Sequence, residues 1–548
     1  MTSSPSLRQA FDADLCVVGA GPVGLALALE SADAGRKVLL IDAGSDAANP
    51  DADDASRAEI IDPKRHVPMD LAVRRGLGGT SWLWGGRCVP FDALDFEARA
   101  AVPDSGWPIG PGDVAHWYDK AVHYLDCGEA DFEAPAAFWP ELADTVGTQR
   151  IERFSRNPQR ARQLGERVRA HANIKTVFGV PVTRLVLAAD GRSLEGLTLH
   201  GRGIVKARDY ALACGGLETT RLLLIAQRER PEKFGGADGP LGRHYMGHIE
   251  GVIADVTFAE RGAIHAFDYR LGEAGAYGRR ILTLTAKAQR VANAMNIAFW
   301  PDNLPYHDPR HRSGIKSLVF LMASVPALGR KLVSEAIRLG IVGPAPHRRF
   351  AHALNVAKHP IDTAQGAIGV LAGRYSGKPR RPGWLPPTPD NSYALHYRGE
   401  QAPRAASRVT LGDERDGFGM ARLKIDLRFE EADARATLAA HDALDAALRR
   451  VGKGVLKYRS PREGLMEAIL AQAHGGYHQL GLTRMGTDPA RSIVDADCRV
   501  HGVANLHVAG SAVFPTGGHA NPTLLATAMA ARLAARLAVV DVEKRAAA

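Results

Sequence analysis

A strand, a glycine-rich turn, a helix and a second strand follow one another near the start of the chain, and this order constrains the fold most. Residues 14–18, DLCVV, read as a short apolar strand, and GAGPVG follows at 19–24. Residues 25–35 have helical composition, and 37–42, KVLLID, read as a second strand that ends in Asp42. This order begins a βαβ nucleotide-binding unit, which predicts an α/β fold with a Rossmann-type domain.

The glycines of the turn, Gly19, Gly21 and Gly24, have distinct physical roles in such a unit. The first permits the tight turn, the second lets the backbone approach a pyrophosphate, and the third lets the helix pack on the strand. The N-terminus of the helix then faces the anion. Asp42 lies at the usual distance along the chain for accepting hydrogen bonds from a ribose. We therefore expect a bound dinucleotide. The turn suits both FAD and NAD, whereas the acid disfavours NADP.

The composition is typical of a globular protein with a large core. A length of 548 residues suggests two domains or one large body with a second lobe. The net charge of +9 is small for this length, and no dense Lys and Arg run with interleaved aromatic residues suggests a nucleic-acid partner. The five cysteines are scattered and lack CxxC spacing, so we expect neither a disulfide framework nor a metal site.

Scattered thiols and an N-terminus without an apolar export segment favour the cytoplasm. No run approaches eighteen uninterrupted apolar residues, so we expect no transmembrane helix.

The pattern of apolar residues changes near residue 248, where alternating strand-like runs begin. After residue 495 the pattern is again that of a nucleotide-binding domain. We expect the nucleotide-binding domain to be discontinuous, with a substrate-binding lobe of β-sheet and helices inserted between its parts. The nucleotide-binding domain comprises residues 1–95, 165–247 and 470–548. The substrate-binding lobe comprises residues 96–164 and 248–469.

Four local features are also predicted. Residues 45–69 read as an irregular excursion, and 316–340 read as a helix with a kink or break at Pro326. Residues 430–452 read as a second long helix, and 376–391 as a Pro-rich linker or lid-like loop.

Three further segments resemble the glucose–methanol–choline (GMC) oxidoreductase family. GLGGTSWLWGGRCVPFDALDF at 76–96 looks like its flavin-facing loop, and LACGGLETTRLLL at 212–224 looks like the strand and turn that pass the FAD adenosine. Residues 477–534 are similar to its C-terminal signature. The resemblance looks closest to the bacterial sugar- and polyol-oxidising branch, related to pyranose oxidases. It covers residues 14–45, 74–110, 205–247 and 395–537.

The resemblance implies FAD as the cofactor and assigns residues to it. Pyranose oxidases link FAD covalently to a histidine, and the matching position holds Leu83, so we expect non-covalent FAD. Beside the glycine turn and Asp42, the residues implied in contact with FAD are Gly79, Thr80, Trp84, Gly85, Val182, Gly510, Ser511, Pro522 and Thr523.

Oxidation of an alcohol removes a proton from oxygen and a hydride from carbon. Flavin N5 can take the hydride, and a histidine has a suitable pKa for taking the proton. His478 and His519 are both candidates, because His519 lies two residues before Asn521 and would share its side in an extended loop. The resemblance assigns the base to His478 and the hydroxyl-binding partner to Asn521. His519 then becomes a neighbour that contacts flavin or substrate. Gln401 either lies at the substrate-cavity wall or closes a strand end.

The sequence thus predicts FAD-dependent oxidation of an alcohol, a sugar or glycoside hydroxyl, to a carbonyl. The electron acceptor stays open between a quinone, another redox partner and oxygen, the last giving an oxidase that produces hydrogen peroxide. One alternative is a non-redox lyase of the same fold, and another is a membrane-surface binding protein. The basic stretch 329–359 is expected to be a solvated helix face, with a lid or a peripheral membrane contact as the alternative.

Overall fold

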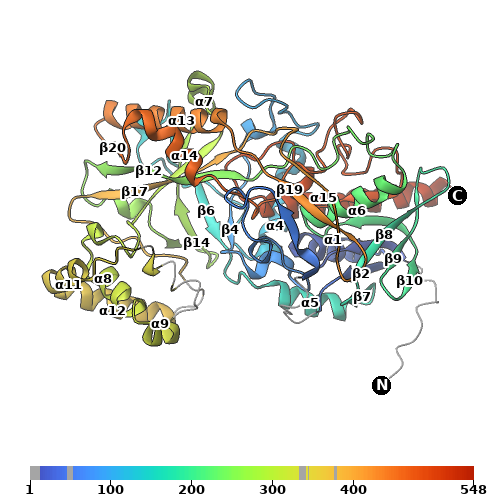
Figure 1. The fold of residues 1–548 in the computed structure, drawn as a ribbon, viewed down its shortest axis with the longest axis horizontal. Helices are drawn as coiled ribbons and strands as arrows, with labels where there is room; N and C mark the ends of the chain where they lie inside the picture. Colours follow the sequence, from blue (N-terminus) through green and yellow to red (C-terminus); the bar gives the residue numbers. More distant parts are fainter. Residues whose placement is uncertain are drawn as a thin grey trace.

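The protein contains a parallel sheet towards one end of its long axis and an antiparallel sheet towards the other (Figure 1). The structure is a computed structural model, and it describes residues 13–45, 54–332, 338, 341–343, 345–375, 379 and 381–547. The predicted α/β fold, with a Rossmann-type sheet and a second lobe built on a β-sheet, is confirmed.

The parallel sheet has five strands in the described residues, and it carries the glycine turn. Helix α1 (Pro22–Asp33) connects β1 to β2, as predicted, and all residues of β2 are buried. Continuous burial is expected where helices cover a parallel sheet. Helix α1 packs on α15 (Thr523–Ala547) and α5 (Ala161–Ala170). The strand order is β21 (Leu506–Val508), β11 (Ala207–Leu212), β1 (Ala13–Val18), β2 (Val38–Asp42) and β7 (Ile174–Phe178).

Helix α15 is a long apolar helix of this core. Its window Thr523–Val540 is, in the part of the chain that the structure describes, the one segment long and apolar enough to cross a membrane. Most of that window is buried against α1 and α4 (Tyr118–Leu125), as in the core helix of a folded domain.

The antiparallel sheet has six strands and lies in the second lobe. Its central strands β12 and β17 pair with Glu250 opposite Arg398 and His248 opposite Glu400. The helices that pack on it are α13 (Glu431–Arg450), α14 (Leu465–Gln472) and α7 (Ala286–Ala292). The strand order is β20 (Gly454–Tyr458), β12 (His248–Phe258), β17 (Ser392–Glu400), β16 (Ile297–Asp302), β15 (Leu282–Leu284) and β5 (Val146–Gly147).

Smaller sheets complete the body of the molecule. One has the order β10 (Gly203–Val205), β9 (Leu194–Leu199) and β8 (Val182–Leu187). A second has the order β13 (Arg270–Leu271), β14 (Tyr277–Arg280), β6 (Ile151–Phe154) and β4 (Arg87–Cys88). A third has the order β18 (Arg408–Arg415), β19 (Ala421–Asp426) and β3 (Ala58–Ile60). Strand β3 corrects the prediction that 45–69 are wholly irregular, because it gains its partner β19 from far along the chain.

Four helices gather at the end of the molecule away from the C-terminus (Figure 1). The predicted break at Pro326 is confirmed, since one helix ends at Ala323 and the next begins at Pro326, where proline suits a first helical position. The rest of the predicted helix, to 340, lies mostly outside the described residues. The helices are α8 (Gly314–Ala323), α9 (Pro326–Leu332), α11 (Arg349–Lys358) and α12 (Pro360–Tyr375). The predicted domain boundaries stay a prediction.

Candidate active site

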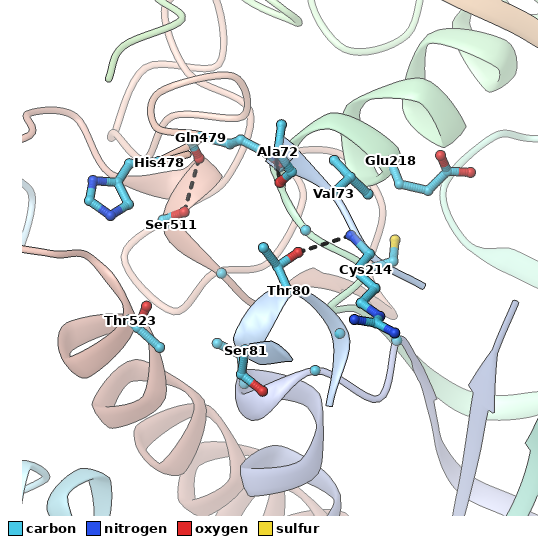
Figure 2. Close-up of a pocket in the computed structure, with 18 of the residues that line it drawn as sticks. Ala72, Val73, Thr80, Ser81, Cys214, Glu218, His478, Gln479, Ser511 and Thr523 are labelled. Atoms are coloured by element: carbon cyan, nitrogen blue, oxygen red, sulfur yellow. Dashed lines mark hydrogen bonds between the residues drawn. The ribbon is translucent and has the colours of Figure 1, made fainter. Parts of the chain in front are cut away.

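The predicted cofactor-binding and catalytic residues line one cavity of about 460 Å³. Figure 2 shows His478 and Thr523 on one side of this pocket and Cys214 and Glu218 on the other. The carboxyl ends of β1 and β2 open into it, as expected for ligand binding by a parallel sheet. The predicted residues that line the cavity are Gly19, Gly21, Asp42, Gly79, Thr80, Leu83, Trp84, Gly85, Val182, His478, Gly510, Ser511, Asn521, Pro522 and Thr523.

The glycine turn is crowded on its protein side and open on its cavity side. Gly19 has a φ of +109°, and a Cβ there would lie 2.4 Å from the Ala213 carbonyl oxygen. A Cβ on Gly24 would lie 1.9 Å from the Gly19 carbonyl oxygen, so Gly24 permits the helix packing and does not itself line the cavity. A Cβ on Gly21 would meet nothing within 4 Å. The open side is where a pyrophosphate can approach the backbone.

The N-termini of three helices line the same cavity. They belong to α1, which starts at Pro22, to α6 (Gly216–Glu229) and to α15, which starts at Thr523. The N-terminal end of a helix presents free N–H groups and a partial positive charge. The cavity is therefore suited to a ligand that carries negative charge.

Asp42 joins three backbone segments at the edge of the cavity. Its Oδ2 accepts a hydrogen bond from the N–H of Ala20 at 2.7 Å, and its Oδ1 accepts from the N–H groups of Gly44 and Gly76 at 2.8 Å each. Burial raises the pKa of Asp42 although these bonds oppose the rise. Asp42 thus holds the glycine turn against the loop after β2, in addition to its predicted contact with a ribose.

The loop 79–85 packs directly on the glycine turn. The N–H of Gly78 donates to the Ala20 carbonyl at 2.8 Å, and a Cβ on Gly79 would lie 3.2 Å from the Gly21 Cα. The indole of Trp84 donates to the Pro158 carbonyl at 2.7 Å, which fixes the far end of the loop. The loop therefore forms a wall beside the place where a pyrophosphate would lie.

His478 and Asn521 lie side by side at the other end of the cavity. Asn521 Nδ2 lies 3.2 Å from His478 Nε2, and Asn521 Oδ1 accepts a hydrogen bond from Arg398 Nη1 at 2.7 Å. Arg398 also donates to Glu250 Oε2 at 2.8 Å. Because the guanidinium only donates, it orients the amide with its NH2 group toward the imidazole. His478 Nε2 then accepts that bond and carries its lone pair toward Asn521.

A second imidazole, that of His248, packs against His478. The ring centroids lie 4.7 Å apart with an interplanar angle of 84°. Both ring nitrogens of His248 are buried without a hydrogen-bond partner in the described residues, and His248 lines the cavity. Burial lowers the pKa of His248 to about 3. Burial, followed by His248, Arg398 and Arg87, holds the pKa of His478 well below its usual range. Both rings are therefore neutral near pH 7.

Comparisons with known proteins relate this chain to oxidoreductases. Residues 403–530 match the sequence model described as GMC oxidoreductase. Paromamine 6'-oxidase of Streptomyces fradiae is 24% identical over 96% of this chain and 91% of its own length. A C-glycoside 3-oxidase of Arthrobacter globiformis is 38% identical over 22% of each chain. The crystal structure of pyridoxine 4-oxidase from Mesorbium loti shares the fold, with a TM-score of 0.52 and 18% identity over 96% of this chain and 99% of that one. In residues 403–530 the chain resembles the GMC oxidoreductases.

The chain is an oxidoreductase that acts on CH–OH donors, and FAD is the cofactor typical of the GMC oxidoreductases. The cavity fits FAD on three observations. Gly21 leaves the backbone of the turn open, the N-terminus of α1 faces the same space, and the loop 79–85 closes its side. A pyrophosphate at the turn would leave His478 and Asn521 available to a substrate at the other end of the cavity.

Two residues predicted to contact substrate do not line the cavity of the oxidoreductase. His519 is fully buried with its Nε2 3.2 Å from Asp92 Oδ2. Burial would raise the pKa of Asp92, but Arg150 and His519 outweigh it and hold that pKa below its usual range. Gln401 is also fully buried, and its Oε1 accepts from the Gly247 N–H at 2.7 Å. For Gln401 this agrees with the other alternative, closure of the strand end after β17. The predicted contact of His519 with flavin or substrate stays a prediction.

The cavity residues that were not predicted include His248, Glu250 and Arg398, which lie near His478 and Asn521. Their signal is the alternation of polar residues in otherwise apolar strands, at 248 and 250 in β12 and at 396, 398 and 400 in β17. Side chains two residues apart in a strand share a face. Among the described residues, no group of three His, Cys, Asp or Glu side chains is arranged to hold a metal ion.

Proposed function

We propose that this chain is a GMC oxidoreductase that oxidises a hydroxyl group of a sugar or glycoside to a carbonyl, with His478 as the base. The observation that carries the proposal is that His478 and Asn521 line the same cavity as the glycine turn. The printed names of relatives that act on paromamine and on C-glycosides support the substrate class.

The side chains can hold a hydroxyl group and remove its proton. Asn521 Nδ2 and His478 Nε2 lie 3.2 Å apart, so a substrate hydroxyl placed beside both, in exchange for the bond between them, meets one donor and one acceptor. His478 is neutral, and its Nε2 takes the hydroxyl proton while Asn521 keeps the hydroxyl oriented. The hydride that leaves the carbinol carbon requires an acceptor, and this is the chemistry that FAD supplies when bound.

Arg398 and His248 support this arrangement from the antiparallel sheet. Arg398 holds the Asn521 amide in the orientation that the hydroxyl requires, and Glu250 holds Arg398. His248 leaves two unpartnered ring nitrogens beside His478, where a second hydroxyl of a polyhydroxylated substrate would supply hydrogen bonds. Such a pocket favours a sugar over a simple alcohol.

The FAD is proposed to be non-covalent. Leu83 lines the cavity at the position that matches the flavin-linking histidine of pyranose oxidases, and its side chain offers no nucleophile. Acid precipitation of the yellow protein should release the flavin into the supernatant. Yellow colour that stays in the pellet would refute non-covalent binding.

A cytoplasmic location is also proposed. The five cysteines are free, which supports it.

The test of the function is a screen of anaerobic flavin reduction. Sugars, glycosides and polyols are mixed with the holoenzyme, and we expect at least one of them to bleach the visible absorbance of the oxidised flavin. Reoxidation by oxygen is then compared with reoxidation by a quinone, which separates an oxidase from a dehydrogenase. Turnover of a substrate without any bleaching would refute the proposal in favour of a lyase.

A further inference from the structure

The net charge of the protein is concentrated in one segment. Residues 314–381, which we call the basic projection, contain eleven Lys or Arg and two Asp or Glu, a net charge of +9. The whole chain also has a net charge of +9, so the remainder of the chain is balanced. The helices of the basic projection are those that gather at the end of the molecule away from the C-terminus (Figure 1).

Helix α11 uses one face to hold the basic projection together. The ring of His352 stacks on Phe320 of α8, with centroids 4.0 Å apart, and its Nδ1 lies 3.0 Å from the Ser317 hydroxyl. Asn355 donates to the same hydroxyl at 3.1 Å and to the Pro309 carbonyl at 2.9 Å. At about 100° per residue, His352 and Asn355 lie on one side of the helix.

The opposite face of α11 is apolar and basic. Phe350 and Leu354 lie one turn apart, and Lys358 follows after another turn. Phe350 is 84% exposed, and Leu354 is also exposed. Among the described residues, no carboxylate pairs with Arg348, Arg349 or Lys358. This face therefore presents large apolar side chains together with Lys358, and Arg348 and Arg349 are exposed at the N-terminal end of the helix.

Helix α12 also has a packed inner face and an exposed apolar outer face. Its inner face approaches α8 closely, since a Cβ on Gly366 would lie 2.8 Å from the Ile315 Cβ, and Thr363 is buried. Its outer face carries Ile361 and Ile368, which are 72% and 68% exposed and lie two turns apart. Large apolar side chains at such exposure are costly in water when they gather on one surface, and they mark a contact site.

We propose that the basic projection docks on an anionic lipid bilayer through the outer faces of α11 and α12. Helices with bulky apolar residues on one face and flanking Lys and Arg lie in the interfacial region of membranes, where the cations meet lipid phosphates. A second copy of the chain does not fit this surface. A two-fold dimer would place the same patch against itself and bring +9 against +9.

The test is co-sedimentation of the full-length holoenzyme with vesicles at low ionic strength. One set of vesicles contains phosphatidylglycerol with phosphatidylcholine, and the other contains phosphatidylcholine alone. We expect binding to the first set and at least tenfold weaker binding to the second. High salt should weaken the binding without abolishing it, because the apolar contacts remain.

Two variants separate the apolar from the basic contribution. The triple variant Phe350→Ser, Ile361→Ser, Ile368→Ser should reduce the partition coefficient at least tenfold. The variant Arg348→Gln, Arg349→Gln should reduce it by on the order of fivefold for each charge removed. Matched controls are Val291→Ser, an equally exposed apolar residue on α7, and Arg435→Gln, an exposed arginine on α13. Flavin content and circular dichroism verify that each variant is folded.

Failure of the holoenzyme to bind anionic vesicles would overturn the proposal, as would binding to both vesicle sets alike. Binding by the triple variant that equals that of the Val291→Ser control would also overturn it. Sedimentation velocity is run in parallel without lipid. An oligomer that the triple variant dissociates, in a protein that does not bind vesicles, would assign the surface to a second copy instead.

Discussion

Replacement of Arg398 by leucine tests how the antiparallel sheet controls the base. Arg398 Nη1 lies 2.7 Å from Asn521 Oδ1, and Asn521 Nδ2 lies 3.2 Å from His478 Nε2. With about 2.3 Å between the two heteroatoms of an amide, the guanidinium nitrogen lies within about 8 Å of His478 Nε2. The cation therefore opposes protonation of His478 at short range.

The size of this effect follows from Coulomb's law. At an effective dielectric constant of about 20, a unit charge about 8 Å away changes the protonation free energy by about 2 kcal/mol, or about 1.5 pH units. Glu250 pairs with Arg398 and offsets part of this energy, so we expect Arg398→Leu to raise the pKa of His478 by about one unit. The variant also loses a charge-assisted hydrogen bond to Asn521, worth about 1.5–3 kcal/mol.

The assay is stopped-flow flavin reduction without oxygen, measured as a function of pH. His478 acts as a base only when it is unprotonated, so the rate falls as the pH drops through its pKa. The depressed pKa of the wild type places this fall well below pH 6.5, and the variant should show it about one pH unit higher. The rate above the fall should be about 10- to 100-fold lower. Arg459→Leu, which removes a charge paired with Asp255, is the control. An unchanged rate and an unchanged pH profile in Arg398→Leu would refute the reasoning.

Three further predictions address the base His478, the contacts of Asp42 with three backbone segments, and the stability of the protein at acid pH. His478→Ala should retain FAD and lose flavin reduction by several orders of magnitude; if His519→Ala has that effect instead, the base is misassigned. Asp42→Asn places an amide NH2 group among three backbone donors, which should lower the free energy of unfolding by about 2–4 kcal/mol and weaken FAD binding, as read from chemical unfolding and flavin titration. Burial lowers the pKa of His441 to about 4, so the unfolded state binds its proton first as the pH falls below about 6.5. Protonation of His441 in the unfolded state should thus lower the free energy of unfolding by about 2 kcal/mol between pH 7 and pH 5. His441→Phe should abolish this part of the pH dependence, as measured by unfolding curves at the two pH values.

The nucleotide-binding end of the cavity was predictable because its contacts are local in sequence. The glycine turn, α1 and Asp42 lie within one βαβ unit. The glycines stand where the turn leaves no room for a side chain or must stay open to a ligand, and the spacing of such glycines is visible in the sequence. The pairing of His478 with Asn521 was available only from the resemblance, because nothing in the spacing of two residues so far apart requires their side chains to meet.

The positions that the sequence did not fix have specific physical causes. The placement of His519 assumed an extended loop, whereas the chain bends at residues 519 and 520, so i and i+2 need not share a side. Gln401 follows Glu400 at the end of β17, and strand alternation directs it away from the face that carries Arg398. Arg398 itself was missed because its partner Glu250 lies on β12, and strand register between distant segments is not visible in the sequence.

The concentration of charge in residues 314–381 also governs how the protein behaves on charged solid supports. A cation exchanger or a negatively charged electrode attracts the molecule at that end alone, because the rest of the chain has no excess charge to compete. Immobilised molecules would then share one orientation. A proteolytic product that lacks this segment would lose the basic isoelectric point of about 9.3 and leave the exchanger at neutral pH. Elution position thus reports whether the segment is intact.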